Sequence, residues 1–187
     1  ATITNPPGFL STNLAGGANT LALGVGSGGA ITLLSDLDSI IANTTLDASL
    51  APAAPTIAGA FNIPLGVATT FHNDGALAQD WTISAIMSGG GSLFKTGNRV
   101  LVLQGINTYT GGTAISAGTL NVNADTALGD AAGVMAFDGG TLKTALGITS
   151  ARTVTIIAGG GTIDTAGVNS TFSGTFFGSG ALTKTGA

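Results

Sequence analysis

A short motif recurs about every 20 residues, and this spacing restricts the fold more than any other feature of the chain. The copies of the motif read AGTLNV at 117–122, GGTLKT at 139–144 and GGTIDT at 160–165. Its apolar residue moves from Leu120 to Leu142 in a step of 22 residues, and then to Ile163 in a step of 21. Leu101 lies 19 residues before Leu120. Such a period fits one coil of a solenoid.

Alternation within the motifs predicts short β-strands. Apolar and polar residues alternate over 119–123 and again over 153–156, which is typical of strands with one buried face. Gly-Gly and Asp-Gly corners separate the runs, and a sharp bend often requires the positive φ that glycine tolerates. Strands this short cannot bury a face alone. We therefore expect an all-β fold, a parallel β-helix (β-solenoid) in which stacked coils enclose one continuous apolar column.

Composition agrees with this fold and excludes several functions. Only 7% of the 187 residues are charged, against roughly a quarter in an ordinary domain. The net charge of −4 argues against a nucleic-acid partner, which requires clustered Lys and Arg. There is no Cys, so disulfides and thiolate metal sites are excluded. The apolar runs are only a few residues long, whereas a spanning helix needs about 20, so this segment is not expected to insert into a membrane.

A longer repeat is superimposed on the short one. The sequence GGSLFKTGN at 90–98 returns as SGALTKTGA at 179–187. Lys95 and Lys184 therefore lie 89 residues apart, an interval that four coils of about 22 residues would fill. Their recurrence predicts an architectural role for both. The second copy stops where RVLVLQGINTYTGG should follow, so we expect a solenoid truncated at its C-terminal end.

The first part of the chain is less regular, and we divide the sequence accordingly. Residues 1–74 are expected to form an N-terminal β-rich or capping part of the solenoid, and residues 75–187 the repeat-bearing β-helix. Apolar residues at helical spacing over 33–41 predict a short helix, and Ser35 with Asp38 could form its capping box. A cap is physically sensible because an open coil exposes unpaired strand edges and core.

One stretch carries a family resemblance. Residues 89–122 read GGGSLFKTGNRVLVLQGINTYTGGTAISAGTLNV, which resembles the autotransporter-associated β-strand repeat (passenger-associated transport repeat) of bacterial passenger domains. The matching positions are Gly91, Leu93, Lys95, Gly97, Leu101, Leu103, Gly105, Asn107, Tyr109, Gly111, Thr113 and Gly118-Thr119-Leu120. Arg99 departs from the usual Gly, which predicts an outward position or an altered corner. The resemblance covers about residues 75–187.

The resemblance implies a right-handed β-helix exported through the outer membrane to the cell surface. It implies a rigid stalk or adhesion scaffold whose repeats aid stepwise folding during secretion. The alternative is a subunit or segment of an extracellular filament that self-associates through its coil ends. A polysaccharide-cleaving β-helix is less favoured. A host-surface or glycan ligand would be the other partner, and its identity is unknown.

The search for chemistry yields no catalytic, cofactor-binding or metal-binding residue. His72 could form a triad with Asp74 or Asp80, but no nucleophile elbow is visible, and an exposed turn is the better interpretation. The carboxylate pairs that glycoside hydrolysis would require are Asp36/Asp38 and Asp125/Asp130, and Asp164 stands alone. We assign all five to caps, turns or bonds within a coil, because Asp is a routine turn residue.

Two further features of the sequence bear on ligand binding, one on calcium and one on glycans. The sequence GGGTID at 159–164 lacks the tandem calcium-binding nonapeptide. Trp81 and Tyr109 could form an aromatic shelf for a glycan, although Tyr109 belongs to the repeat pattern and therefore favours a structural role. Phe172, Phe176 and Phe177 are expected to stack inside or cover the column.

Overall fold

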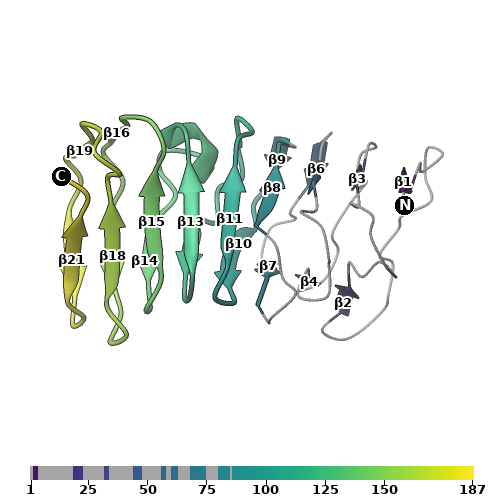
Figure 1. Cartoon of the computed structure of the whole chain (residues 1–187), viewed down its shortest axis with the longest axis horizontal. Coiled ribbons are helices and arrows are strands. Elements are labelled where there is room, and N and C mark those ends of the chain that lie inside the picture. Colours follow the sequence, from purple (N-terminus) through teal and green to yellow (C-terminus); the bar gives the residue numbers. More distant parts are fainter. Residues whose placement is uncertain are drawn as a thin grey trace.

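The computed structural model is a parallel β-solenoid in which the strands lie side by side along one long axis (Figure 1). It describes residues 2–3, 19–22, 32–33, 44–47, 56–57, 60–62, 68–74, 80–84 and 86–187. The predicted all-β class is confirmed: these residues form strands joined by corners, with one 3-10 turn, η1 (Asp125–Leu128). The right-handed sense remains a prediction from the family resemblance.

Two long sheets make up the solenoid. The nine-stranded sheet contains, in spatial order, β1 (Thr2–Ile3), β3 (Thr32–Leu33), β5 (Thr56–Ile57), β8 (Trp81–Ile83), β11 (Val100–Leu103), β13 (Thr119–Val122), β15 (Thr141–Thr144), β18 (Gly161–Asp164) and β21 (Leu182–Thr185). The eight-stranded sheet contains β2 (Asn19–Ala22), β4 (Thr44–Asp47), β7 (Ala68–His72), β10 (Ser92–Thr96), β12 (Thr113–Ile115), β14 (Met135–Phe137), β17 (Val154–Ile156) and β20 (Phe176–Gly178). Two small pairs join β6 (Ala60–Asn62) to β9 (Ile86–Ser88) and β16 (Thr149–Ser150) to β19 (Thr171–Phe172).

The apolar column predicted from the short repeat is confirmed. Leu101, Leu120, Leu142 and Ile163 lie directly above one another in register, and each is at most 4% exposed. Alternation therefore determines which side chains enter the core, because neighbouring residues of a strand point to opposite faces of the sheet. The column continues from coil to coil, so each coil buries its apolar face against the next.

A buried asparagine connects three consecutive coils. The Asn107 side chain accepts a hydrogen bond from the backbone N–H of Met87 at 2.8 Å, and it donates one to the carbonyl of Ala127 at 2.7 Å. Tyr109, two residues further on, is fully buried and its Oη lies 2.6 Å from Thr113 Oγ1. The Asn and Tyr of the repeat pattern are thus structural, as expected for Tyr109.

The long repeat does not behave as predicted. Starting from Leu93 in β10, four steps through the eight-stranded sheet end at Phe176 in β20. Leu182 lies in the next strand, β21, which belongs to the nine-stranded sheet. The interval of 89 residues is therefore four coils and a further part of one, and the prediction that four coils fill it is wrong. Lys95 and Lys184 occupy different sheets.

The predicted N-terminal helix over 33–41 lies almost entirely outside the described residues. Its first residue, Leu33, is in strand β3. Asp36, Asp38 and the capping box at Ser35 also lie outside the described residues. Arg99, which departs from the repeat pattern, is half-buried in the bend between β10 and β11.

Candidate binding surface

The outer face of the nine-stranded sheet is polar. Four threonines align on successive strands in the order Thr119, Thr141, Thr162 and Thr183. A second row, two residues along each strand, runs through Val102, Asn121, Lys143 and Asp164. This face presents hydroxyl, amide and charged groups to water, as a solvated sheet face does.

The outer face of the eight-stranded sheet is different. Pairing places five residues in one row, namely Phe94, Ala114, Ala136, Thr155 and Phe177. This part of the row carries no charged side chain, and Phe94 and Phe177 enclose three smaller residues. Beyond Phe94 the row continues to Thr70 on β7. Phe177 is 52% exposed, so the prediction that it stacks on the column is wrong. Phe172 and Phe176 are partly buried and pack against the core, as predicted.

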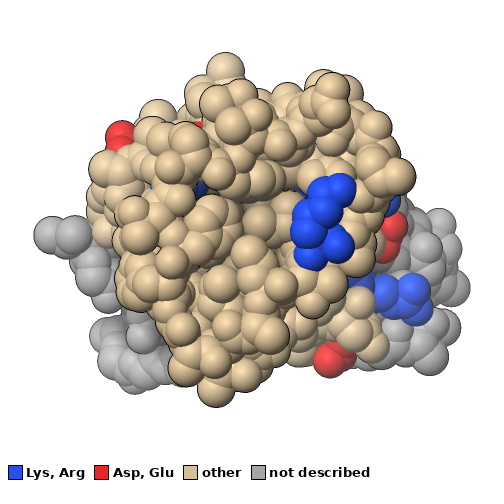
Figure 2. All heavy atoms as spheres, turned by 90° about the vertical axis from the view of Figure 1, so that its left-hand side faces the viewer, with Lys and Arg blue, Asp and Glu red and all other residues tan. Residues whose placement is uncertain are grey.

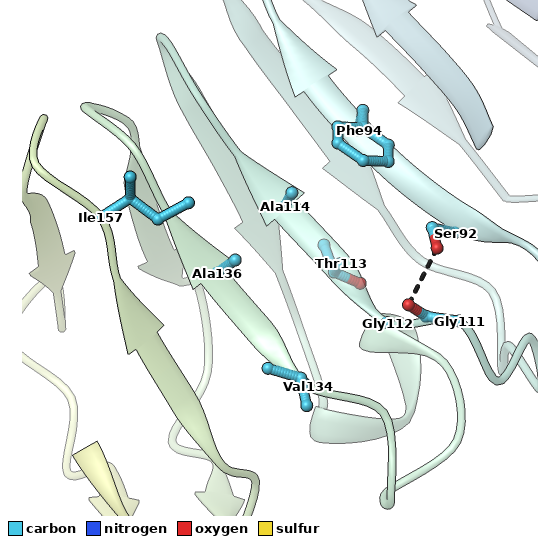
Figure 3. Close-up of a pocket in the computed structure, with 9 residues that line it drawn as sticks. All are labelled: Ser92, Phe94, Gly111, Gly112, Thr113, Ala114, Val134, Ala136 and Ile157. Carbon is cyan, nitrogen blue, oxygen red and sulfur yellow. Dashed lines mark hydrogen bonds between the residues drawn. The ribbon is translucent and has the colours of Figure 1, made fainter. Parts of the chain in front are cut away.

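The small residues of this row create a hollow of about 280 Å³. Figure 3 shows Ala114 and Ala136 between the larger side chains of Phe94 and Ile157, with Val134 beside them. Neighbouring strands are about 4.8 Å apart, so an alanine methyl group cannot fill the space beside a phenyl ring on the next strand. Val134 and Ile157 are nearly half exposed. The hollow is thus an open apolar groove on the side of the solenoid.

The polar atoms around the groove are already engaged. Ser92 Oγ donates to the carbonyl of Gly111 at 2.9 Å, the bond drawn in Figure 3. Thr113 points into the core, where its hydroxyl donates to the Leu128 carbonyl at 3.2 Å. What remains accessible is carbon: methyl groups, a phenyl ring and backbone at the Gly111-Gly112 corner. Gly112 turns there with φ of +87°, which explains the need for glycine at this position.

A buried arginine holds the loop that contains η1. Arg152 is 3% exposed, and its Nε lies 3.0 Å from Asp125 Oδ1. Its guanidinium also donates to the backbone carbonyls of Asp125, Gly129 and Asp130. The five N–H groups of an arginine suit such a cluster of carbonyl oxygens. Sequence reasoning missed this role, because a lone arginine shows no spacing pattern that points to its partners.

Buried Lys95 occupies a similar nest of carbonyl groups. It lies in an inward-facing row with Ile115, and its ammonium group donates to the carbonyls of Thr96, Gly97 and Ala117 at 2.7, 2.7 and 3.2 Å. Burial lowers the pKa of Lys95 from 10.5 to about 8, and the negative charge of Asp74 opposes part of this shift. The predicted architectural role fits a side chain that satisfies carbonyls of two successive coils.

The catalytic candidates lie in structural arrangements. His72 is at the end of strand β7 and is half-buried, so its prediction as an exposed turn residue is wrong. Its Nε2 lies 3.3 Å from Asp74 Oδ2 and its Nδ1 2.9 Å from Thr96 Oγ1. Asp80 is exposed and precedes strand β8. These contacts make His72 a hydrogen-bonded group at the end of its strand.

Asp125, Asp130 and Asp164, three of the carboxylates considered for glycoside hydrolysis, have structural partners. Asp125 pairs with Arg152, and Asp130 Oδ1 accepts a hydrogen bond from the backbone N–H of Ala132 at 2.9 Å. Asp164 Oδ1 accepts one from the N–H of Ala166 at 2.9 Å, within its own coil as predicted. Over residues 69–74, 80–84 and 86–187, no three His, Cys, Asp or Glu side chains are grouped so that they could hold a metal ion.

The aromatic shelf proposed for a glycan does not exist on this surface. Trp81 and Tyr109 are both 0% exposed, and Phe71 packs edge-on against Trp81 with ring centroids 5.4 Å apart. Both rings belong to the core. The alignment of Phe94 with Phe177 on the outer face of the eight-stranded sheet was not predicted, because it depends on the pairing register between coils, which a single strand's sequence does not contain.

Comparison with known proteins agrees with the fold. Residues 93–122 match the passenger-associated-transport-repeat (PATR) family. The chain is 42% identical over 106 residues to the adhesin BmaC autotransporter of Brucella suis biovar 1 (strain 1330), a match that covers 57% of this chain and 3% of that relative. No solved structure matches the chain. Among the described residues, no helix is long and apolar enough to cross a membrane.

The chain is a β-solenoid that carries a PATR repeat over residues 93–122, and it is similar to a part of an adhesin autotransporter. It is accordingly an exported, cell-surface sequence.

Proposed function

We propose that this segment is a non-enzymatic scaffold, a rigid stalk within an adhesive passenger. The observation that supports the proposal is the unbroken parallel pairing from β7 through β20, with the same residues of each coil turned inward. The relative's printed name describes an adhesin, which is consistent with a stalk that presents adhesive regions elsewhere in the protein. Two buried titratable groups, Lys95 and Arg152, hold neighbouring coils together, which is consistent with a structural role.

We further propose that the stacked coils fold one after another during secretion. Each coil buries apolar residues against the coil that preceded it, so every step releases free energy without the rest of the chain. The Leu101–Leu120–Leu142 column is where this coupling lies, because each side chain packs on its counterpart in the neighbouring coils.

The test is surface display of the complete passenger with one coil disrupted. Leu120→Asp places a charge in the fully buried column, and Asn123→Asp places the same group three residues further on, at an exposed position. We expect Leu120→Asp to reduce the protease-accessible passenger on intact cells at least severalfold, and Asn123→Asp to leave it near normal. Equal display of both variants would count against a folding role, and display with lost adhesion would separate the scaffold from the folding aid.

A second candidate is self-association through coil ends. Figure 2 looks onto the C-terminal side of the solenoid and shows only scattered charged residues on it, so charge repulsion between two such faces would be small. Light scattering over a range of protein concentrations tests this candidate. Growth into rods that are multiples of one length would support it, and a single mass at all concentrations would exclude it.

A further inference from the structure

We infer that the groove on the eight-stranded sheet binds the alkyl chain of an uncharged amphiphile. The groove is the hollow lined by Phe94, Ala114, Ala136, Val134 and Ile157. Its volume of about 280 Å³ lies just below the range for small-molecule sites, roughly 300 Å³ and above, and suits a slender ligand. The inference goes beyond the scaffold role and does not depend on it.

The shape of the groove favours a narrow, extended ligand. Ala114 and Ala136 form the floor on two neighbouring strands, and Phe94 closes the end towards β10. Figure 3 shows Ile157 at the opposite end of the floor, so the long direction of the groove runs across the strands, along the solenoid axis. In the same row, Thr155 and Phe177 continue this direction over the next two strands.

The chemistry of the lining excludes sugars and charged peptides as occupants. The Ser92 and Thr113 hydroxyls are committed to the carbonyls of Gly111 and Leu128. A sugar hydroxyl or peptide amide placed in the groove would lose its water without gaining a partner, at a cost of about 1–3 kcal/mol for each group. No lining residue is charged, so an ionic ligand finds no counter-charge. An alkyl chain fits both conditions, with its polar head left in water.

The size of the face argues against a second copy of the chain as the occupant. From Phe94 to Phe177 the row crosses four strand spacings, about 19 Å, and strands of three residues are about 10 Å long. The resulting area of about 200 Å² is roughly a quarter of the ~800 Å² that each partner of a stable complex buries.

The experiment titrates the protein with alkyl maltosides whose tails have six, eight and ten carbons, below their micelle concentrations. Methyl NMR of alanine and isoleucine follows the groove directly. We expect shifts at the methyl groups of Ala114, Ala136 and Ile157, with an affinity that rises about fourfold per added methylene while the tail remains within the groove. Maltose without a tail should produce no shifts at these methyls.

Groove-filling variants provide the decisive control. Ala136→Phe should reduce the affinity for the ten-carbon maltoside at least tenfold, and Ala136→Leu should reduce it less. Thr141→Phe adds the same ring to the outer face of the other sheet and should leave the affinity unchanged. The inference is overturned if maltose alone shifts the groove methyls, if tail length has no effect, if folded Ala136→Phe or Ala136→Leu binds as tightly as the natural chain, or if sedimentation shows the groove occupied by a second copy.

Discussion

Two Lys-Thr-Gly corners of this solenoid have the same local structure and opposite surroundings. Gly97 and Gly186 both have φ of +74°, and in each corner the lysine ammonium donates to the carbonyl of that glycine. Lys95, however, is 0% exposed and also donates to Ala117 of the next coil, whereas Lys184 is exposed on β21, the last strand of its sheet. Local sequence therefore determines the corner, and the neighbouring coil determines whether the lysine is buried.

Replacing each lysine by alanine should produce the largest difference in stability between the buried corner and the exposed corner. Lys95→Ala removes the ammonium donor from three backbone carbonyls and opens a cavity, so we expect a loss of about 3 kcal/mol in the free energy of unfolding. Lys184→Ala should cost less than about 0.5 kcal/mol, as exposed substitutions do. Urea unfolding followed by circular dichroism measures both. Similar losses in the two variants would show that the corner, and not its burial, provides the stability.

Alanine at Gly97 should also destabilise the chain more than alanine at Gly186, but by a smaller difference in the free energy of unfolding than for the two lysines. A Cβ on Gly97 would lie 2.4 Å from the carbonyl oxygen of Asn73 in the stacked coil, and one on Gly186 would lie 2.5 Å from the backbone N of Ala166. Both substitutions cost about 1–2 kcal/mol for the left-handed backbone. We expect Gly97→Ala to cost about 1 kcal/mol more than Gly186→Ala, because β21 is paired on one side and can shift. Urea midpoints of the two variants in the reverse order would contradict this.

The pH dependence of stability should also distinguish the lysines. The pKa of Lys95 is lowered to about 8 in the folded chain. Between pH 8 and 10 the unfolded chain therefore binds more protons than the folded chain, so the free energy of unfolding rises with pH. Burial raises the pKa of Tyr109, and its opposing effect begins near pH 10.

The check is a set of urea midpoints between pH 7.5 and 10. The natural chain should gain stability across this window relative to Lys95→Met, which cannot titrate. Lys184→Met serves as the matched control and should follow the natural chain. Parallel profiles for the natural chain and Lys95→Met would remove Lys95 as the titrating group.

The sequence was sufficient for features that repeat in every coil. Leu120, Leu142 and Ile163 were placed in one column because alternation fixes the inward face and the period fixes the stacking. The same logic failed for Lys184, since a local motif does not specify in which of the two sheets its strand will lie.

The candidate groove could not be predicted from any single segment. It results from Phe94, Ala114 and Ala136 meeting across coils of 20 and 22 residues, and these unequal lengths set the register. Arg152 was missed for the same reason, because its partners in the loop around η1 precede it by about one coil.

The bridging position of Asn107 has a mechanical consequence. Hydrogen bonds of a parallel ladder run between strands, and here strands succeed one another along the long axis, so tension on a tethered passenger loads the coil interfaces in series. The weakest interface yields first. The Asn107 side chain forms hydrogen bonds with Met87 in the preceding coil and with Ala127 in the following coil. Separation of its coil from either neighbour must therefore also break a buried side-chain hydrogen bond. This coil is therefore expected to be among the last to rupture when the solenoid is stretched along its long axis.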